Sequence, residues 1–267
     1  MRNRVLPKRT TSTFVLGFFI VSLTLVSALP QGQVVTPQAR QQSSKIKQAE
    51  DVDTSKFPVL DFVSPEIGNE KERAKREAKG KKYNTRHVPP ITESKEKIFA
   101  NIDWDAGLPA FPIEQSAAVI IGKVSTGQAY LSQDKTSVYS EFEIQIEQVI
   151  KRDLLTDLAP GSSVVVERVG GRVRFPSGKV MVSVVSRQQM PQVGTRYVLF
   201  LTHQPLLGPV SPEAFFILTG YELRDSQVFP LDQLPPGHPI TAYAGTNADL
   251  FLNDLTSALL ASSPQAK

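Results

Sequence analysis

The sequence predicts a mainly β domain, a small antiparallel barrel or sandwich, followed by a C-terminal helix. Three observations lead to this prediction. Short runs of β-branched and apolar residues follow one another from residue 117 to residue 232. Turns rich in Gly, Pro, Asp and Ser separate these runs, and no helical crossover lies between them. One run also changes phase in the way that bends a strand, and bent strands let small barrels close.

The first two runs carry the clearest strand patterns. AAVIIGKV at 117–124 is apolar throughout, as expected of a strand that is covered on both faces. VYSEFEIQIEQVIK at 138–151 alternates, with Phe142 and Ile146 on the apolar side. The alternation slips at Gln148. A strand that keeps its buried face across such a slip needs a bulge there.

Shorter runs and one helix complete the predicted domain. Turn signals at 176–178 and 224–226 each predict a hairpin. A Pro-rich loop and a helix occupy 233–267, with Thr246 and Asp249 as the expected capping box. The remaining predicted strands cover 162–169, 172–175, 179–185, 196–202, 214–221 and 227–231.

The chain before residue 117 differs in composition from the rest. Residues 1–29 have a basic start followed by an uncharged, apolar stretch at 14–29, which predicts either a signal peptide cleaved after Ala28 or a membrane anchor. The composition of residues 30–90 predicts a disordered basic linker. Residues 91–116 are expected to form an irregular arm with a short helix.

Charge and cysteine content exclude several classes of function. The first 90 residues hold 16 Lys and Arg against 8 Asp and Glu, whereas the remainder holds 14 against 18. The basic balance therefore belongs to the export segment and linker, and we expect no nucleic-acid partner. The chain has no cysteine, which excludes disulfides, thiolate catalysis and Cys-ligated metal. We expect no cofactor.

Several motifs together resemble a known class of proteins. VIIGKV, VYSEFEIQIEQVIKRD, PGSSVVVERVGG, VGTRYVLFL and ILTGYELRDSQVFPLD, within 117–232, resemble a recurrent class of uncharacterised exported bacterial β-domain proteins. The layout is also similar, at the level of topology, to the OB-fold barrel of netrin modules and tissue inhibitors of metalloproteinases. This likeness implies an OB-like barrel. It carries over no mechanism, because those inhibitors use an N-terminal cysteine.

One basic cluster is the candidate binding site. Arg168, Arg172, Arg174 and Lys179 surround the Gly-Gly break at 170–171. Such an edge suits an anionic or protein partner. The alternative is that these charges only protect an edge strand from pairing with other chains.

The sequence matches none of the catalytic and metal-binding motifs compared with it. His87, His203 and His238 do not form an HExxH motif, and the chain has no GxSxG or P-loop sequence. The segment 101–107 resembles a calcium loop but lacks the Gly and Glu that an EF-hand requires. We therefore expect no metal site.

Three functions remain open. The first is a non-catalytic binding module of the periplasm, cell envelope or extracellular space, with an envelope protein or anionic polymer as its partner. The second is a hydrolase that uses His203 or His238 beside Glu213 or Asp232. The third is a membrane-tethered structural or sensory subunit, in contact with the membrane through residues 1–29 and 70–86.

Export and cleavage can be tested on the mature protein. If signal peptidase reads Val26 and Ala28, N-terminal sequencing of the exported protein should begin at Leu29. Ala28→Arg should block cleavage, because the enzyme accepts small residues at that position. A native protein that still begins at its original N-terminus would instead support the membrane anchor.

Overall fold

The computed structural model describes residues 52–63, 69–206 and 210–262. The export segment at 1–29 and the first part of the expected linker lie outside these residues. The described residues belong to one compact unit.

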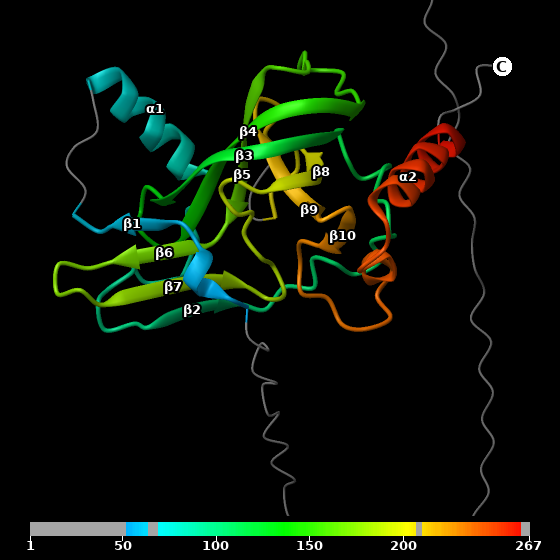
Figure 1. Ribbon diagram of the computed structural model, residues 1–267. Helices are drawn as coiled ribbons and strands as arrows, with labels where there is room; N and C mark the ends of the chain where they lie inside the picture. The colour runs from blue at the N-terminus through cyan, green and yellow to red at the C-terminus, as the bar shows by residue number, and fades with distance from the viewer. Residues whose placement is uncertain (1–51, 64–68, 207–209, 263–267) are drawn as a thin grey trace, which may run out of the picture. The chain divides into compact units, whose positions relative to one another are not determined.

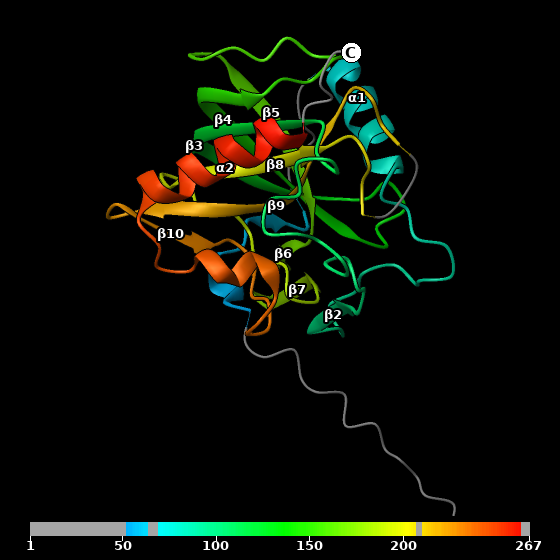
Figure 2. The same cartoon turned by 90° about the vertical axis from the view of Figure 1, so that its right-hand side faces the viewer.

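The described part of the chain is mainly β, with ten strands in two sheets and two α-helices (Figures 1 and 2). Two 3₁₀ helices lie at Thr54–Lys56 and Pro239–Tyr243. The other elements are β1 (Val59–Asp61), α1 (Glu70–Lys81), β2 (Lys97–Ala100), β3 (Ala118–Leu131), β4 (Val138–Lys151), β5 (Ser163–Val169), β6 (Gly171–Arg174), β7 (Val180–Val185), β8 (Arg196–Thr202), β9 (Phe215–Arg224), β10 (Gln227–Pro230) and α2 (Ala248–Ser262).

The larger sheet closes on itself. Its order is β10-β9-β5-β4-β3-β8, and β8 also pairs with β9, so that five strands form a hydrogen-bonded ring. All neighbours in the ring are antiparallel except β5 and β9, which run parallel over two residue pairs, Val166 with Phe215 and Glu167 with Phe216. One core cluster gathers alternate residues from all five ring strands, among them Phe142 and Ile144 of β4.

The predicted bulge in β4 is present. The pairing of β4 with β3 passes from Gln148 opposite Ile121 to Ile146 opposite Gly122, which leaves Glu147 without a partner. This extra residue bends the strand where the alternation of the sequence slips.

The Gly-Gly break carries the chain from the ring into the smaller sheet. Gly171 has a φ of 145°, and a Cβ atom placed on it would lie 2.9 Å from the side chain of Val138. Only glycine fits this close approach. The break therefore allows close packing between the two sheets.

The smaller sheet corrects the expectation for residues 52–116. Its order is β1-β6-β7-β2, and both edge strands pair in parallel with the β6–β7 hairpin. Phe57 beside β1 is buried, and β2 replaces the short helix expected within 91–116. These two strands have only three and four residues, too few for a periodic pattern to reveal them.

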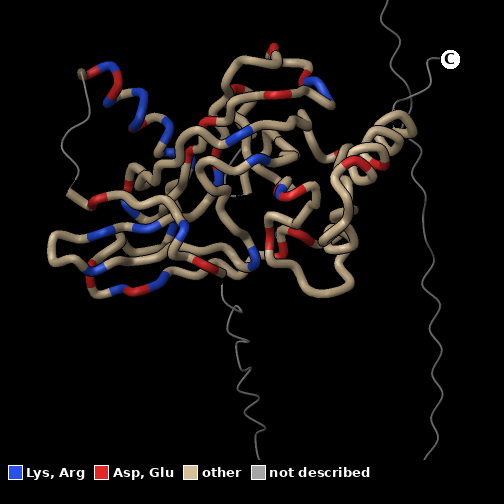
Figure 3. The backbone as a smooth tube through the Cα atoms, in the orientation of Figure 1, with Lys and Arg blue, Asp and Glu red and all other residues tan. Residues whose placement is uncertain are grey.

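Helix α1 is docked on the ring by ion pairs. Arg76 lies 2.6 Å from Glu141, and Lys79 lies 2.8 Å from Glu141 and 3.1 Å from Glu167. Beyond the helix, the hydroxyl of the buried Tyr83 donates a hydrogen bond to Glu167. Figure 3 shows the basic residues along α1. The described part of the basic linker is thus ordered at this helix.

The reason for this docking is electrostatic. Arg76 and Lys79 are three residues apart on one face of α1, and the side chain of Glu167 is only 2% exposed. A carboxylate buried to this degree is costly unless it is paired and hydrogen-bonded. Helix α1 lies within the segment expected to be a disordered basic linker, and it docks on the ring through an ionic face.

Helix α2 covers another side of the ring through an apolar face. Phe251 and Leu255 are fully buried against a cluster that includes Phe200 and Tyr221. The side chain of Asn247, in place of the expected Thr246, caps the helix by accepting from the amide of Asp249. Among the described helices, none is long and apolar enough to cross a membrane.

The ionic docking of α1 predicts a large effect at Glu167. Glu167→Gln should lower the free energy of unfolding by about 2 kcal/mol, because it removes charge-assisted hydrogen bonds to Lys79 and Lys82. Chemical denaturation measures this change. Glu147→Gln is the matched control, because its partner Arg196 is half exposed. This control variant should lower the free energy of unfolding by less than about 1 kcal/mol. Equal losses would contradict the docking role.

Candidate functional site

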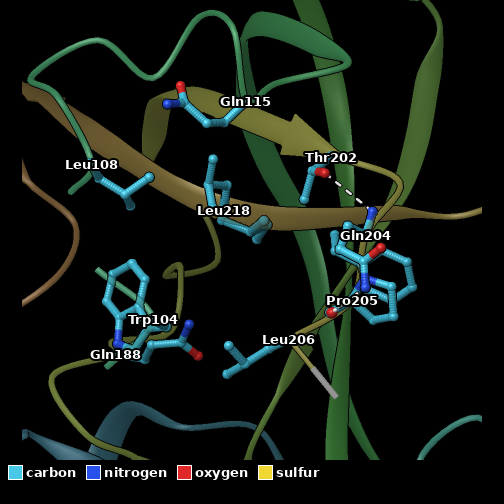
Figure 4. A pocket seen from close by; sticks show the side chains of 11 residues that line it. Trp104, Leu108, Gln115, Gln188, Thr202, Gln204, Pro205, Leu206 and Leu218 are labelled. Atoms are coloured by element: carbon cyan, nitrogen blue, oxygen red, sulfur yellow. Dashed lines mark hydrogen bonds between the residues drawn. The ribbon is translucent and has the colours of Figure 1, made fainter. Parts of the chain in front are cut away.

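An apolar cavity of about 390 Å³ lies between the end of β8, the start of β9 and the arm before β3 (Figure 4). Its volume falls within the range of small-molecule sites. The residues that line it are uncharged, and they are Trp104, Leu108, Gln115, Gln188, Thr202, Gln204, Pro205, Leu206, Phe216, Ile217 and Leu218.

Gln188 is the most unusual residue of this lining. It is only 4% exposed, and its amide oxygen Oε1 has no hydrogen-bond partner among the described residues. Figure 4 shows its terminal amide at the wall of the cavity, between Trp104 and Leu206. Buried polar groups in folded proteins are almost always paired. This oxygen is an exception, but it is itself buried and offers no surface to the space of the cavity.

Trp104 is held rigidly at the same wall. Its indole nitrogen donates a 2.7 Å hydrogen bond to the carbonyl of Ser186. The guanidinium carbon of Arg168 lies 5.8 Å from the centre of the ring. These contacts hold the arm before β3 against the rest of the fold.

A buried ion pair lies behind this wall. Arg168 and Asp232 approach to 2.8 Å, with side chains 1% and 0% exposed. Arg168 also donates to the carbonyl of Gln189, and Asp232 accepts from the amide of Gln189 and from Thr219. The backbone N–H and carbonyl of Gln189, the residue after Gln188, are therefore both hydrogen-bonded to this ion pair.

The cavity lining offers hydrogen bonds and apolar contact but no ionisable side chain. No lining residue is an acid, a base or a cysteine, so the wall supplies no general acid or base and no thiolate. The amides of three glutamines and the hydroxyl of Thr202 offer hydrogen bonds to a ligand. The aromatic and aliphatic side chains offer apolar contact.

The four basic residues predicted as a site are not brought together. Arg168 is buried in the ion pair described above and cannot reach a partner at the surface. Arg172 donates to the carbonyl of Phe57, and Arg174 pairs with Asp61 at 2.6 Å. Lys179 is exposed at the β6–β7 hairpin.

The two histidines proposed for a hydrolase are engaged within the protein. Nδ1 of His203 faces the carbonyl of Ala214 at 2.9 Å, and Nε2 faces the carboxylate of Asp153 at 3.2 Å. His238 caps a 3₁₀ helix by accepting from the amide of Ile240. The carboxylates expected beside the histidines were those of Glu213 and Asp232. The partners in the structure differ from these, and Asp232 binds Arg168.

The carboxylates of the segment that resembles a calcium loop are occupied by an arginine side chain. Arg187 pairs with both Asp103 and Asp105. In the ranges that the structure covers, no cluster of three or more His, Cys, Asp or Glu residues could hold a metal ion.

Sequence reasoning did not find the cavity. Its lining comes from separate segments, the arm, the stretch after β7 and the region of β8 and β9, and consists of common uncharged residues without a motif. The one available signal is the chain's single tryptophan in the arm. Comparisons with models of known protein families and with curated proteins find no match to this sequence.

Asp153 gives a prediction about acid stability. Burial alone raises the pKa of Asp153, but hydrogen bonds, led by the one from His203, and the charge of that histidine outweigh burial and hold the pKa below its ordinary value. A carboxyl whose pKa is lower in the folded state stabilises the protein above its unfolded pKa. That stabilisation is lost as the pH falls through the folded pKa.

Asp153→Asn should therefore destabilise the protein by about 1 kcal/mol at neutral pH. The difference in free energy of unfolding between this variant and the wild type should shrink below about pH 4. Urea denaturation at several pH values measures this difference. Asp157→Asn is the control, because that side chain is 95% exposed. A difference that stays constant down to the lowest pH would contradict the role of Asp153.

Proposed function

We propose that this protein is a non-catalytic, exported binding module built on an OB-like barrel. The observation that carries the proposal is the cavity at Trp104, which has a mainly apolar lining, a few amide and hydroxyl groups and no ionisable side chain. A site with these properties holds a ligand in a fixed orientation and contains no group that reacts with it.

The arrangement of the ring supports the OB-like assignment. OB folds are five-stranded, partly open Greek-key barrels. Here five strands are joined in a ring, and its weakest contact is the two-residue parallel pairing of β5 with β9. The β6–β7 hairpin is inserted between the third and fourth ring strands, β5 and β8.

The sequence supports export. The basic start, the apolar stretch at 14–29 and the small residues before Leu29 are typical of a secretory signal. The lack of cysteine does not oppose this, because a domain of this size can be stabilised by its core alone.

The hydrolase alternative receives less support from the geometry. Both ring nitrogens of His203 face oxygen acceptors of the protein itself. Neither nitrogen is left to take a proton from a substrate, which a general base must do.

An anionic polymer is also a weaker candidate partner than an uncharged ligand. Arg76, Lys79 and Lys82 of the basic stretch are paired with carboxylates of the ring. Arg174 is paired with Asp61. Such charges are already compensated within the protein.

The proposed function can be tested by thermal unfolding in the presence of fractionated envelope extract. A fraction that contains the ligand should raise the midpoint temperature, because a ligand that binds only the folded state stabilises it. Mass spectrometry should then recover the bound component chemically unchanged. Chemical alteration of the component would contradict a non-catalytic role.

Two variants that each introduce a glutamate locate the binding site. Leu206→Glu places a charge in the cavity wall and should abolish the rise in midpoint temperature. Lys179→Glu, on the exposed β6–β7 hairpin, should leave the rise unchanged. If no fraction stabilises the wild-type protein, the proposed function is wrong.

A further inference from the structure

We infer that two copies of this chain associate about a two-fold axis, with Leu154 and Leu155 of each copy entering the cavity at Trp104 of the other. These leucines belong to the leucine loop, residues 152–157, which follows β4. The inference goes beyond the proposed function, because it assigns the cavity a second occupant, a segment of another copy of the same chain.

The leucine loop presents two apolar side chains to solvent in a fixed conformation. Leu154 is 99% exposed and Leu155 is 68% exposed. One carboxylate oxygen of Asp153 accepts a hydrogen bond from the backbone amide of Leu155 at 3.2 Å, and the other lies 3.2 Å from Nε2 of His203. A loop that is already ordered loses less conformational freedom on binding, which lowers the cost of association.

The leucine loop begins beside the mouth of the cavity. Gln115 and Gln204 are the exposed residues of the cavity lining and therefore mark its mouth. The loop is attached next to both of them. Lys151 donates to the carbonyl of Ser116, the residue after Gln115, and the loop carboxylate described above faces His203, the residue before Gln204.

A protrusion beside a recess makes a surface complementary to itself. A two-fold rotation about an axis between them brings the protrusion of each copy to the recess of the other, so the same contact forms twice. The volume also suffices. An apolar cavity of about 150 Å³ holds benzene, which is larger than a leucine side chain, and this cavity has about 390 Å³.

The chemistry of the two surfaces matches. The leucines bring no charge to a lining that has no ionisable side chain. Leu108, Leu206 and Phe216 of the lining offer apolar contact, which gains free energy in proportion to the area removed from water. The contact is small, so the dimer belongs to the class of weak, transient interfaces.

Sedimentation velocity of the purified protein, at concentrations from about 10 µM to about 1 mM, tests the association. The wild type should pass from monomer to dimer across this range. The emission of Trp104, the only tryptophan of the chain, should shift to shorter wavelength over the same concentrations. The reason is that the leucines of the second copy displace water from the indole ring.

Two charged variants test the contact itself. Leu154→Lys alters the loop, Leu206→Glu alters the cavity, and each alone should weaken dimerisation at least about tenfold, because a lone charge enters an apolar site. An equimolar mixture should form a heterodimer, in which the lysine meets the glutamate and the unaltered loop meets the unaltered cavity. Leu250→Lys is the matched control, because Leu250 of α2 is 61% exposed, and it should dimerise like the wild type.

Three results would each overturn the inference: a wild type that stays monomeric up to about 1 mM, normal dimerisation of Leu154→Lys, or a mixture that stays monomeric. Because Leu154 is almost wholly exposed, Leu154→Lys should keep the fold, which circular dichroism checks. If the wild type is monomeric and Leu154→Lys removes binding to phosphatidylcholine vesicles, the loop contacts a membrane and the inference is wrong.

The proposed function is tested separately, at about 1 µM protein, where a weak dimer dissociates. An envelope fraction that raises the midpoint temperature there supports the proposed function even if the chain does not dimerise. Dimerisation without such a fraction would leave the present inference standing and the proposed function wrong.

Discussion

The ion pair between Arg168 and Asp232 is the constraint on which the candidate site depends. It joins the end of β5 to the segment that follows β10, and both side chains are almost completely buried. A buried charge is costly unless it is paired and hydrogen-bonded, and this pair also binds Gln189 and Thr219. The position of Gln188 in the cavity wall is a consequence of these bonds.

A second set of ionic contacts lies on the opposite face of β5. Glu167, next to Arg168 in the chain, points to the other side of the strand and receives Lys79, Lys82 and Tyr83. Burial together with the charge of Glu167 raises the pKa of Tyr83 well above its ordinary value, so that the hydroxyl remains a donor. Adjacent residues of one strand thus anchor α1 on one face and the cavity on the other.

The strands of the ring were predictable because each carries a strong local signal. The run RYVLFLT was assigned to 196–202 and forms β8 at those residues, and the phase slip near Gln148 corresponds to the bulge at Glu147. Where the local signal was weak, the prediction failed. β1 and β2 are short edge strands whose parallel partners come from the distant β6–β7 hairpin, and no local pattern encodes such a pairing.

The sequence alone determined the mainly β character, the length and order of most ring strands, the C-terminal helix and the separation of a basic N-terminal third from a mildly acidic remainder. These features follow from periodicity and composition, which act over a few residues. Tertiary structure alone decided which charged side chains pair within the protein and where uncharged residues line a cavity. Arg168 and Arg174 look alike in the sequence, yet one is buried against Asp232 and the other is half exposed beside Asp61. The difference arises because burial and pairing depend on partners more than 60 residues away.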